Sequence, residues 1–314
     1  MEQGWVRQHA SLPLSLEAAR TLLAPHGLEP VGLQVLTEGK ANTNVKLELS
    51  DGRPAVLRLY QREKPAQLLE TALLRKFKGE IPVAEVIVAD PDAGWILLEF
   101  LPGRTLQQAA AEGASDDILS AAHGIGAALA TIEAVQFTRP GFLDASLTIV
   151  DPWPSVIDGL QGYLDTCLAR PLLAQRVGDD IVRSVHRAWD EARPSLEAIT
   201  AKPNLSHADF KPSNLLIHEG RLSGVLDWEF AHSGTWLLDA GQVLRHRGEL
   251  PEDFPSEVAR GLQEGGLDIP DGWQKWAGVI DLMSLVDFLG RDVCSDGTVR
   301  HIGRLIHGTL FVPT

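Results

Sequence analysis

Residues 206–214 read Ser206-His207-Ala208-Asp209-Phe210-Lys211-Pro212-Ser213-Asn214, and this stretch decides what the chain folds around. It contains the pattern H-x-D-x-K-x-x-N. A short apolar run, a Glu-Gly turn and a second apolar run follow it, which is the pattern of a β-hairpin. The returning strand leads to Asp227, thirteen positions after Asn214. Because a hairpin brings its two ends together, we expect Asp209, Asn214 and Asp227 to lie close to one another.

These side chains suit phosphoryl transfer, a reaction that needs positioning and charge neutralisation more than covalent chemistry. Asp209 is expected to orient an attacking hydroxyl and accept its proton. Asn214 and Asp227 supply oxygen atoms of the kind that Mg²⁺ prefers, and Lys211 is expected near the transferred phosphate. His207 is interpreted as orienting the loop by hydrogen bonding. Singly, each residue also fits a structural hydrogen bond, a turn or a strand end, but their joint spacing favours catalysis.

The sequence on either side of this stretch predicts two lobes. Runs typical of β-strands occupy 31–36, 45–49, 55–60 and 95–101, and apolar residues from Leu69 to Phe77 fall at helical spacing. Helical patterns dominate from residue 104 onward, interrupted by a predicted loop from Pro140 to Pro154 and by the one small hairpin. We therefore expect an α+β, bilobal fold with a β-rich N-lobe over 1–102 and a larger helical C-lobe over 103–314.

Composition narrows the class of protein. The chain has 314 residues, which allows two domains or one two-lobed unit. A net charge of −14 repels phosphate backbones, so nucleic-acid binding is a poor hypothesis. The two cysteines, Cys167 and Cys294, form no disulfide framework or zinc motif. No signal peptide is evident, and no apolar run approaches the roughly 20 residues that span a bilayer. We expect a cytoplasmic protein without a membrane partner.

The central motif carries a family resemblance. His207 to Leu216, with Leu226-Asp-Trp-Glu-Phe230, resembles the aminoglycoside phosphotransferase and choline-kinase-like family over most of the chain. The resemblance implies a protein-kinase-like fold, Mg²⁺, and ATP or GTP as the phosphate donor, bound by the N-lobe. Its implied nucleotide-binding residues are Arg58 with its helix partner Glu70, Gly39 and Asn44 in the phosphate loop, and Glu99 and Leu101 at the adenine-binding hinge. Asp239 matches an acidic position that we interpret as an anchor for the catalytic loop.

The departures from protein kinases favour a small-molecule kinase. The protein-kinase motifs G-x-G-x-x-G, V-A-I-K, D-F-G and A-P-E are absent from the sequence. The chain turns helical soon after Asp227, which leaves no room for an activation loop. Arg58 stands where a lysine is usual and presents a broad fork in place of a point charge, so Lys46 is an alternative phosphate contact. A pseudokinase that binds nucleotide or metabolite, and a Ser/Thr protein kinase, are the competing hypotheses.

The acceptor is less well defined by the sequence. Residues 101–314 hold 17 basic and 29 acidic residues, so nearly all the negative charge lies in the predicted C-lobe. This charge indicates either a pocket for a cationic hydroxyl compound or a solvated acidic surface, and the second interpretation is the one we favour. Six of the eight tryptophans also lie there, where they suit core packing or cation–π contact with a quaternary amine. The chain is expected to be a monomer or a homodimer.

Overall fold

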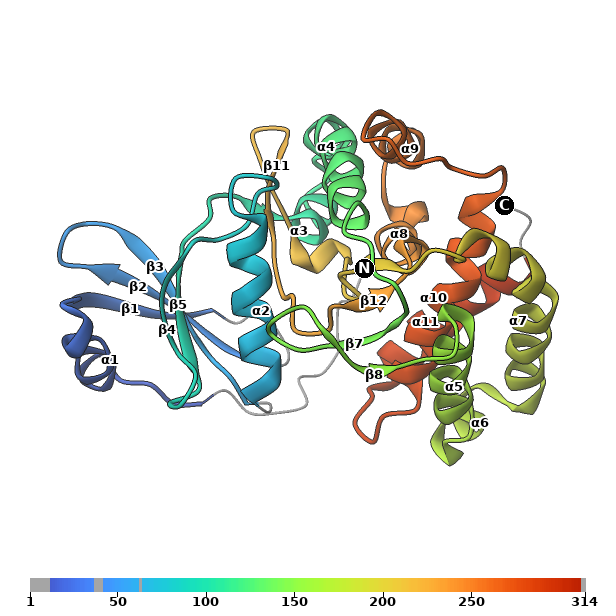
Figure 1. The fold of residues 1–314 in the computed structure, drawn as a ribbon, viewed down its shortest axis with the longest axis horizontal. Helices are drawn as coiled ribbons and strands as arrows, with labels where there is room; N and C mark the ends of the chain where they lie inside the picture. The colour runs from blue at the N-terminus through green and yellow to red at the C-terminus, as the bar shows by residue number, and fades with distance from the viewer. Residues whose placement is uncertain (1–11, 37–41, 62–63, 312–314) are drawn as a thin grey trace.

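A computed structural model describes residues 12–36, 42–61 and 64–311. Strands dominate up to residue 105 and helices dominate afterwards, as Figure 1 shows. The N-terminal elements are α1 (Leu16–Leu23), β1 (Pro30–Leu36), β2 (Thr43–Leu49), β3 (Pro54–Leu59), α2 (Lys64–Phe77), β4 (Val86–Asp90), β5 (Trp95–Glu99) and β6 (Arg104–Thr105). The C-terminal elements are α3 (Leu106–Ala111), α4 (Ser115–Glu133), β7 (Gly141–Leu143), β8 (Ile149–Pro152), α5 (Val156–Leu168), α6 (Pro171–Val177), α7 (Asp179–Ile199), β9 (Asn204–Ser206), β10 (Leu215–His218), β11 (Arg221–Val225), β12 (His232–Gly234), α8 (Trp236–Leu244), α9 (Phe254–Glu264), α10 (Trp273–Leu289) and α11 (Asp296–Phe311). The expected α+β, bilobal, kinase-like fold is confirmed.

The N-terminal sheet has the strand order β1-β2-β3-β5-β4, and its neighbouring strands are antiparallel. Successive side chains of a strand point to opposite faces. Leu57 of β3 therefore joins the apolar cluster that α1 covers, whereas Arg58 points to the other face. Arg58 pairs across the sheet with Asn44 and Ile96. Strand alternation alone thus places the predicted cation on the face that looks toward α2 and the helical region.

The second face of the sheet is continuous with the core of the helical region. Apolar residues of α2 and β5 belong to the same buried cluster as those of α4, α8 and α10. Phe77, at the end of α2, stacks on Trp228 with 5.0 Å between ring centroids. Figure 1 shows α2 between the sheet and the helices. The contact joins the predicted phosphate-binding side of the chain to the residue that follows Asp227.

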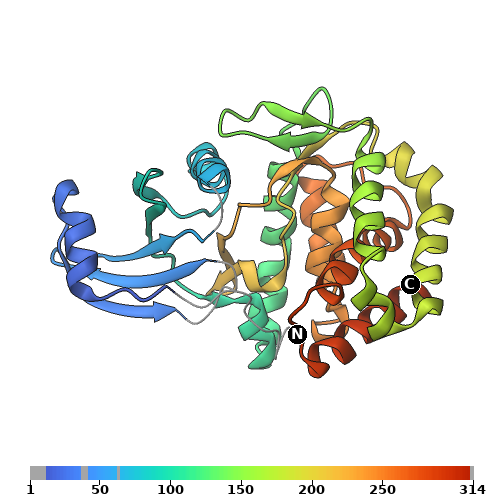
Figure 2. The same ribbon diagram turned by 90° about the horizontal axis from the view of Figure 1, so that it is seen from below.

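The helical region contains two small sheets, where the sequence predicted one hairpin. β11-β10-β6 and β8-β7-β12-β9 are the two strand orders. The predicted loop from Pro140 to Pro154 is wrong, because β7 and β8 form a hairpin there. β8 is the edge strand of its sheet, where proline is tolerated, and its side chains are mostly exposed, so no apolar alternation marks it. Figure 2 shows this hairpin projecting from the helices on the side of α2.

Close helix contacts complete the core. α4 and α9 approach so tightly that a Cβ atom at Gly261 would lie 2.1 Å from the carbonyl oxygen of His123. Among the described residues, no helix combines the length and the apolar character needed to cross a membrane. The boundary between the N-lobe and the C-lobe at residues 102 and 103 stays a prediction.

Candidate active site

The loop that carries Asp209 is held from behind by α8. The carboxylate of Asp239, fully buried, accepts hydrogen bonds from the backbone N–H groups of His207 at 2.8 Å and Ala208 at 2.7 Å. Gln242, one helical turn later, accepts from Phe210 N at 2.7 Å and donates to Ala208 O at 2.9 Å. Burial raises the pKa of Asp239 to about 7, against the two N–H bonds that lower it. Asp239 therefore fixes the backbone of the loop just before Asp209, as expected of an anchor.

Two residues of the site adopt the left-handed backbone region that favours glycine. Ala208 has φ 64° and Asp227 has φ 63°. A side chain other than glycine in this region costs roughly 1–2 kcal/mol. The hydrogen bonds from α8 hold Ala208 in this conformation, which turns the next residue, Asp209, toward Asn214.

His207 connects the two catalytic segments. Its Nδ1 accepts a hydrogen bond from Asp209 N at 3.2 Å, so its Nε2 carries the proton and donates to Leu226 O at 2.9 Å. The ring is fully buried, and burial lowers its pKa to about 4. His207 is therefore neutral near pH 7, and it ties the loop before Asp209 to the residue before Asp227.

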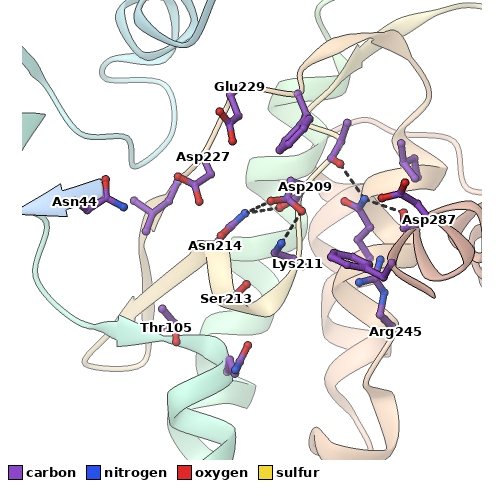
Figure 3. Close-up of a pocket in the computed structure, with 18 of the residues that line it drawn as sticks. Asn44, Thr105, Asp209, Lys211, Ser213, Asn214, Asp227, Glu229, Arg245 and Asp287 are labelled. Carbon is purple, nitrogen blue, oxygen red and sulfur yellow. Dashed lines mark hydrogen bonds and ion pairs between the residues drawn. The ribbon is translucent and has the colours of Figure 1, made fainter. Parts of the chain in front are cut away.

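Asp209 lies between an amide and an ammonium group. Its Oδ2 accepts a hydrogen bond from Asn214 Nδ2 at 2.7 Å, and its Oδ1 pairs with Lys211 Nζ at 2.9 Å. Figure 3 shows these contacts, with Asp227 on the neighbouring strand end. The hairpin explains the proximity, because Leu226 N donates to Asn214 O at 2.9 Å. The structure thus brings together Asp209, Lys211, Asn214 and Asp227, as the spacing predicted.

Arg58 joins the N-terminal sheet to Asp227. Its guanidinium donates to Glu70 on α2 through Nη1, to Asp227 through Nη2, and to Asn44 Oδ1 through Nε at 3.0 Å. Burial alone would lower the pKa of Arg58, but the carboxylates of Asp227 and Glu70 raise it well above its usual value. Tyr60 donates its hydroxyl to Glu70. The expected partner, Glu70, is present, and Asp227 is a second partner that the sequence did not indicate.

A cavity of about 1200 Å³ lies between the sheet and the helices and contains the site. Asn44, Arg58, Glu99 and Leu101 line it from the N-terminal side. Asp209, Lys211, Asn214 and Asp227 line it from the C-terminal side. Glu70 is 1% exposed and holds Arg58 from behind. Gly39 lies outside the described residues. Lys46, the alternative phosphate contact, places its Nζ 4.1 Å from the ring centre of Phe100.

The donor set fits a magnesium ion. Asn214 uses its amide nitrogen toward Asp209, which directs its amide oxygen to other partners, and Asp227 adds a carboxylate. Hard oxygen donors of these two kinds suit Mg²⁺ better than a softer metal. Burial raises the pKa of Asp227, but the charges of Arg58 and Lys211 lower it by more, so the net pKa is below its usual value. Asp227 is therefore ionised at neutral pH.

Some residues of the site were missed by sequence reasoning. Gln242 lies three positions after Asp239, a helical spacing that would have placed both on one face of α8. Asn42 donates to Glu229 at 3.2 Å across 187 positions, for which the sequence carries no signal. Away from the cavity, His246, Glu249 and His301 bring possible metal-ligand atoms within 4.8 Å of one another, although their sequence spacing is not that of a metal motif.

The fold and the site together define a kinase-like phosphotransferase. A five-stranded sheet carries Arg58, a helix supplies its partner Glu70, and a loop before a hairpin carries Asp209. A model of the phosphotransferase enzyme family matches residues 32–279. The chain belongs to this family and is a small-molecule kinase. The expected family resemblance is confirmed, and the comparisons give the pseudokinase hypothesis no support.

Solved structures agree on the fold. Macrolide 2′-phosphotransferase MphH from Brachybacterium faecium is 18% identical, with a TM-score of 0.63 over 95% of this chain and 99% of that one. A thermostable variant of aminoglycoside phosphotransferase APH(4)-Ia, in a ternary complex with AMP-PNP and hygromycin B, is 20% identical, with a TM-score of 0.67 over 92% and 96% of the two chains. Another such variant, with ADP and hygromycin B, is 19% identical with a TM-score of 0.65, over 94% and 98%. A search among curated proteins gives no match.

Proposed function

We propose that this chain transfers the γ-phosphoryl group of ATP or GTP, bound with Mg²⁺, to a hydroxyl group of a small molecule. The observation that carries the proposal is the convergence of Asp209, Asn214 and Asp227 at one cavity, with Lys211 beside them. The cavity reaches the sheet on one side and the helices on the other. Donor and acceptor can therefore occupy opposite sides of the same carboxylate.

The nucleotide is assigned to the sheet side. Arg58 supplies the cation toward its phosphates, and Glu70 and Asn44 hold the guanidinium in place. Glu99 and Leu101 line the cavity at the end of β5, where the base would lie. The APH(4)-Ia structures bind AMP-PNP or ADP, which supports a nucleoside triphosphate as the donor here.

Asp209 is assigned as the catalytic base. Its contacts with Lys211 and Asn214 stabilise the ionised carboxylate and fix its orientation. It orients the acceptor hydroxyl and takes up the proton as the oxygen bonds to phosphorus. Lys211 is assigned to the charge on the transferred group. Mg²⁺, held by Asn214 and Asp227, would neutralise charge on the nucleotide phosphates.

Three further expectations concern the charge of the acceptor, the assembly of the protein and its location. The acidic charge of the helical region leaves a cationic acceptor or a solvated surface as alternatives, of which the second is favoured, and a monomeric or homodimeric state and a cytoplasmic location stay predictions. The segment 226–235 connects β11 to α8 and contains β12, so these described residues form no activation loop. This short connection favours a small acceptor over a protein substrate.

The test is an ADP- and GDP-release screen across aminoglycosides, amino alcohols, sugars, homoserine and macrolides, followed by Asp209→Asn. Positioned proton transfer contributes about 10²–10⁴-fold, so this variant should lose turnover by that factor while it keeps its affinity for the Mg²⁺–nucleotide complex. The matched control is Asp190→Asn, an exposed residue on α7, with turnover unchanged. Full turnover in Asp209→Asn would contradict the assignment.

A further inference from the structure

The exposed apolar side chains of this protein gather at the cavity. Among the described residues, nine large hydrophobic side chains are exposed, and five of them line the cavity. Four of these five belong to the C-terminal region, and the fifth, Val35, lies on β1 of the N-terminal sheet. The four are Phe142 at 51% exposed, Tyr163 at 45%, Phe230 at 37% and Val293 at 54%. Apolar side chains grouped around a cavity, unlike isolated ones, indicate a ligand that covers them.

Phe142 also belongs to an aromatic wall of the cavity, together with Trp153 and His232, and this wall is rigidly built. Phe142 meets Trp153 edge-to-face at 5.3 Å between ring centroids, and Trp153 lies 5.2 Å from His232. The Trp153 ring lies directly on the backbone of α5 at Gly159, where a Cβ atom would come within 2.1 Å of the ring. Any larger residue at this position would displace the indole. The rings of Phe142 and Trp153 are nearly perpendicular, so the wall is a fixed but angled apolar surface, suited to a ligand with a broad apolar surface of its own.

The acidic charge of the helical region lies elsewhere. Of its 29 acidic residues, four line the cavity within the described part of the chain. Asp209, Asp227 and Glu229 belong to the catalytic segments, which leaves Asp287 on α10 as the fourth. The Asp287 carboxylate is bracketed by Arg170 Nη1 at 2.8 Å and by Arg291 Nη2 at 2.6 Å. Two guanidinium groups on one carboxylate leave no net negative charge to attract a cationic acceptor.

We propose that the acceptor is an uncharged alcohol with a broad apolar surface, seated on the wall formed by Phe142 and Trp153. Arg291 lines the cavity and adds a second positive charge beside Asp287, which already pairs with Arg170, so the local charge is net positive and disfavours a cationic acceptor. This proposal rests on the proposed phosphotransfer at Asp209. The acidity of the helical region is then a property of its solvated surface, the interpretation that the sequence favoured.

The first test measures the apolar contact without phosphate transfer. The probe is the neutral fluorophore N-phenyl-1-naphthylamine, titrated into the full chain with AMP-PNP present to fill the nucleotide side. The double variant Phe142→Ser/Val293→Ser should weaken its binding about tenfold or more, because burial of two such side chains contributes more than the roughly 1.4 kcal/mol that a tenfold change requires. The matched control is Phe311→Ser/Val150→Ser, whose residues are exposed but do not line the cavity. Equal affinity in both double variants would overturn the proposal.

The second test measures charge selection with a matched pair of ligands. 2-Naphthylmethanol and protonated 2-naphthylmethylamine share one skeleton and differ in charge, and each displaces the fluorophore. The wild type should prefer the alcohol. Arg291→Gln should shift the preference toward the amine by up to about fivefold, the strength of a partly exposed ion pair. The matched control is Arg304→Gln, an exposed residue on α11 that does not line the cavity, and it should leave the preference unchanged. A wild type that prefers the amine would overturn the proposal.

These binding results are independent of the phosphotransfer assay. If the wild type selects the neutral probe but phosphorylates no acceptor, the proposed function fails and the assignment of the apolar wall stands. If it phosphorylates a cationic acceptor with a higher kcat/KM than its uncharged counterpart, the proposed function stands and the acceptor class is wrong.

Discussion

Removal of the Arg58 guanidinium should destabilise the fold far more than removal of an exposed arginine from the turn between β2 and β3. Arg58 and Glu70 have side chains 6% and 1% exposed, so Arg58→Ala leaves a buried carboxylate without its cation. Such a loss typically costs 3–5 kcal/mol. Arg53 pairs with Asp51 at 2.7 Å, but these side chains are 62% and 46% exposed. Arg53→Ala should therefore leave the free energy of unfolding nearly unchanged.

Urea unfolding measures both variants, with the free energy of unfolding extrapolated to water and the slopes compared. Arg58→Lys should fall between wild type and Arg58→Ala, because a lysine keeps the charge but cannot contact Glu70, Asp227 and Asn44 as a planar fork does. Arg58→Ala/Glu70→Gln should recover part of the loss, since it removes the unpaired charge. If Arg58→Ala and Arg53→Ala lie within 1 kcal/mol of each other, the reasoning is refuted.

Three further predictions concern the loop and the core. Asp239→Asn keeps one acceptor oxygen for two backbone N–H groups, so it should cost about 1–3 kcal/mol in the free energy of unfolding and lower kcat while nucleotide affinity, measured by titration, is retained. Burial holds the pKa of His207 at about 4 in the folded chain, below its usual 6.5. On acidification, the unfolded chain therefore takes up a proton before the folded chain does, and the free energy of unfolding should fall by about 2 kcal/mol between pH 6.5 and 5. Urea titrations of His207→Gln should lack this fall with pH. If the wild type and the variant lose stability in parallel as the pH falls, the prediction is wrong. Gly261→Ala forces α9 from α4 and should cost at least about 1–3 kcal/mol, whereas Gly303→Ala on α11, with open space around it, should be neutral or stabilising by up to about 1 kcal/mol; thermal melts of the two would separate these effects.

The local part of the site could be predicted because its chemistry is written within short distances along the chain. Asp209, Lys211 and Asn214 fall within six positions, and a hairpin brings Asp227 to them. Strand alternation likewise put Arg58 on the face that α2 covers, where Glu70 meets it. The structure places these residues together, and their catalytic roles stay predictions until the variants are measured.

Other parts of the site depend on contacts that local patterns do not encode. Arg58 reaches Asp227 across 169 positions, which a reading of strands and helices does not reveal. Trp153 becomes a wall of the cavity because Gly159 lets its ring lie on α5, whereas the sequence offered core packing or cation–π contact for the tryptophans. Arg291 lies four positions after Asp287, so their pairing was accessible to helix spacing; that both line the cavity was not.

The left-handed backbone at Ala208 and Asp227 has a consequence for how such an enzyme adapts to heat. A residue held in this region makes the folded state less stable than a glycine would, and that deficit is a standing cost of orienting the catalytic carboxylates. Because a glycine adopts the same backbone without this cost, position 208 is a place where stability could be gained while the turn that orients Asp209 is kept. A thermostable relative would therefore be expected to carry glycine at this turn as one of its stabilising differences.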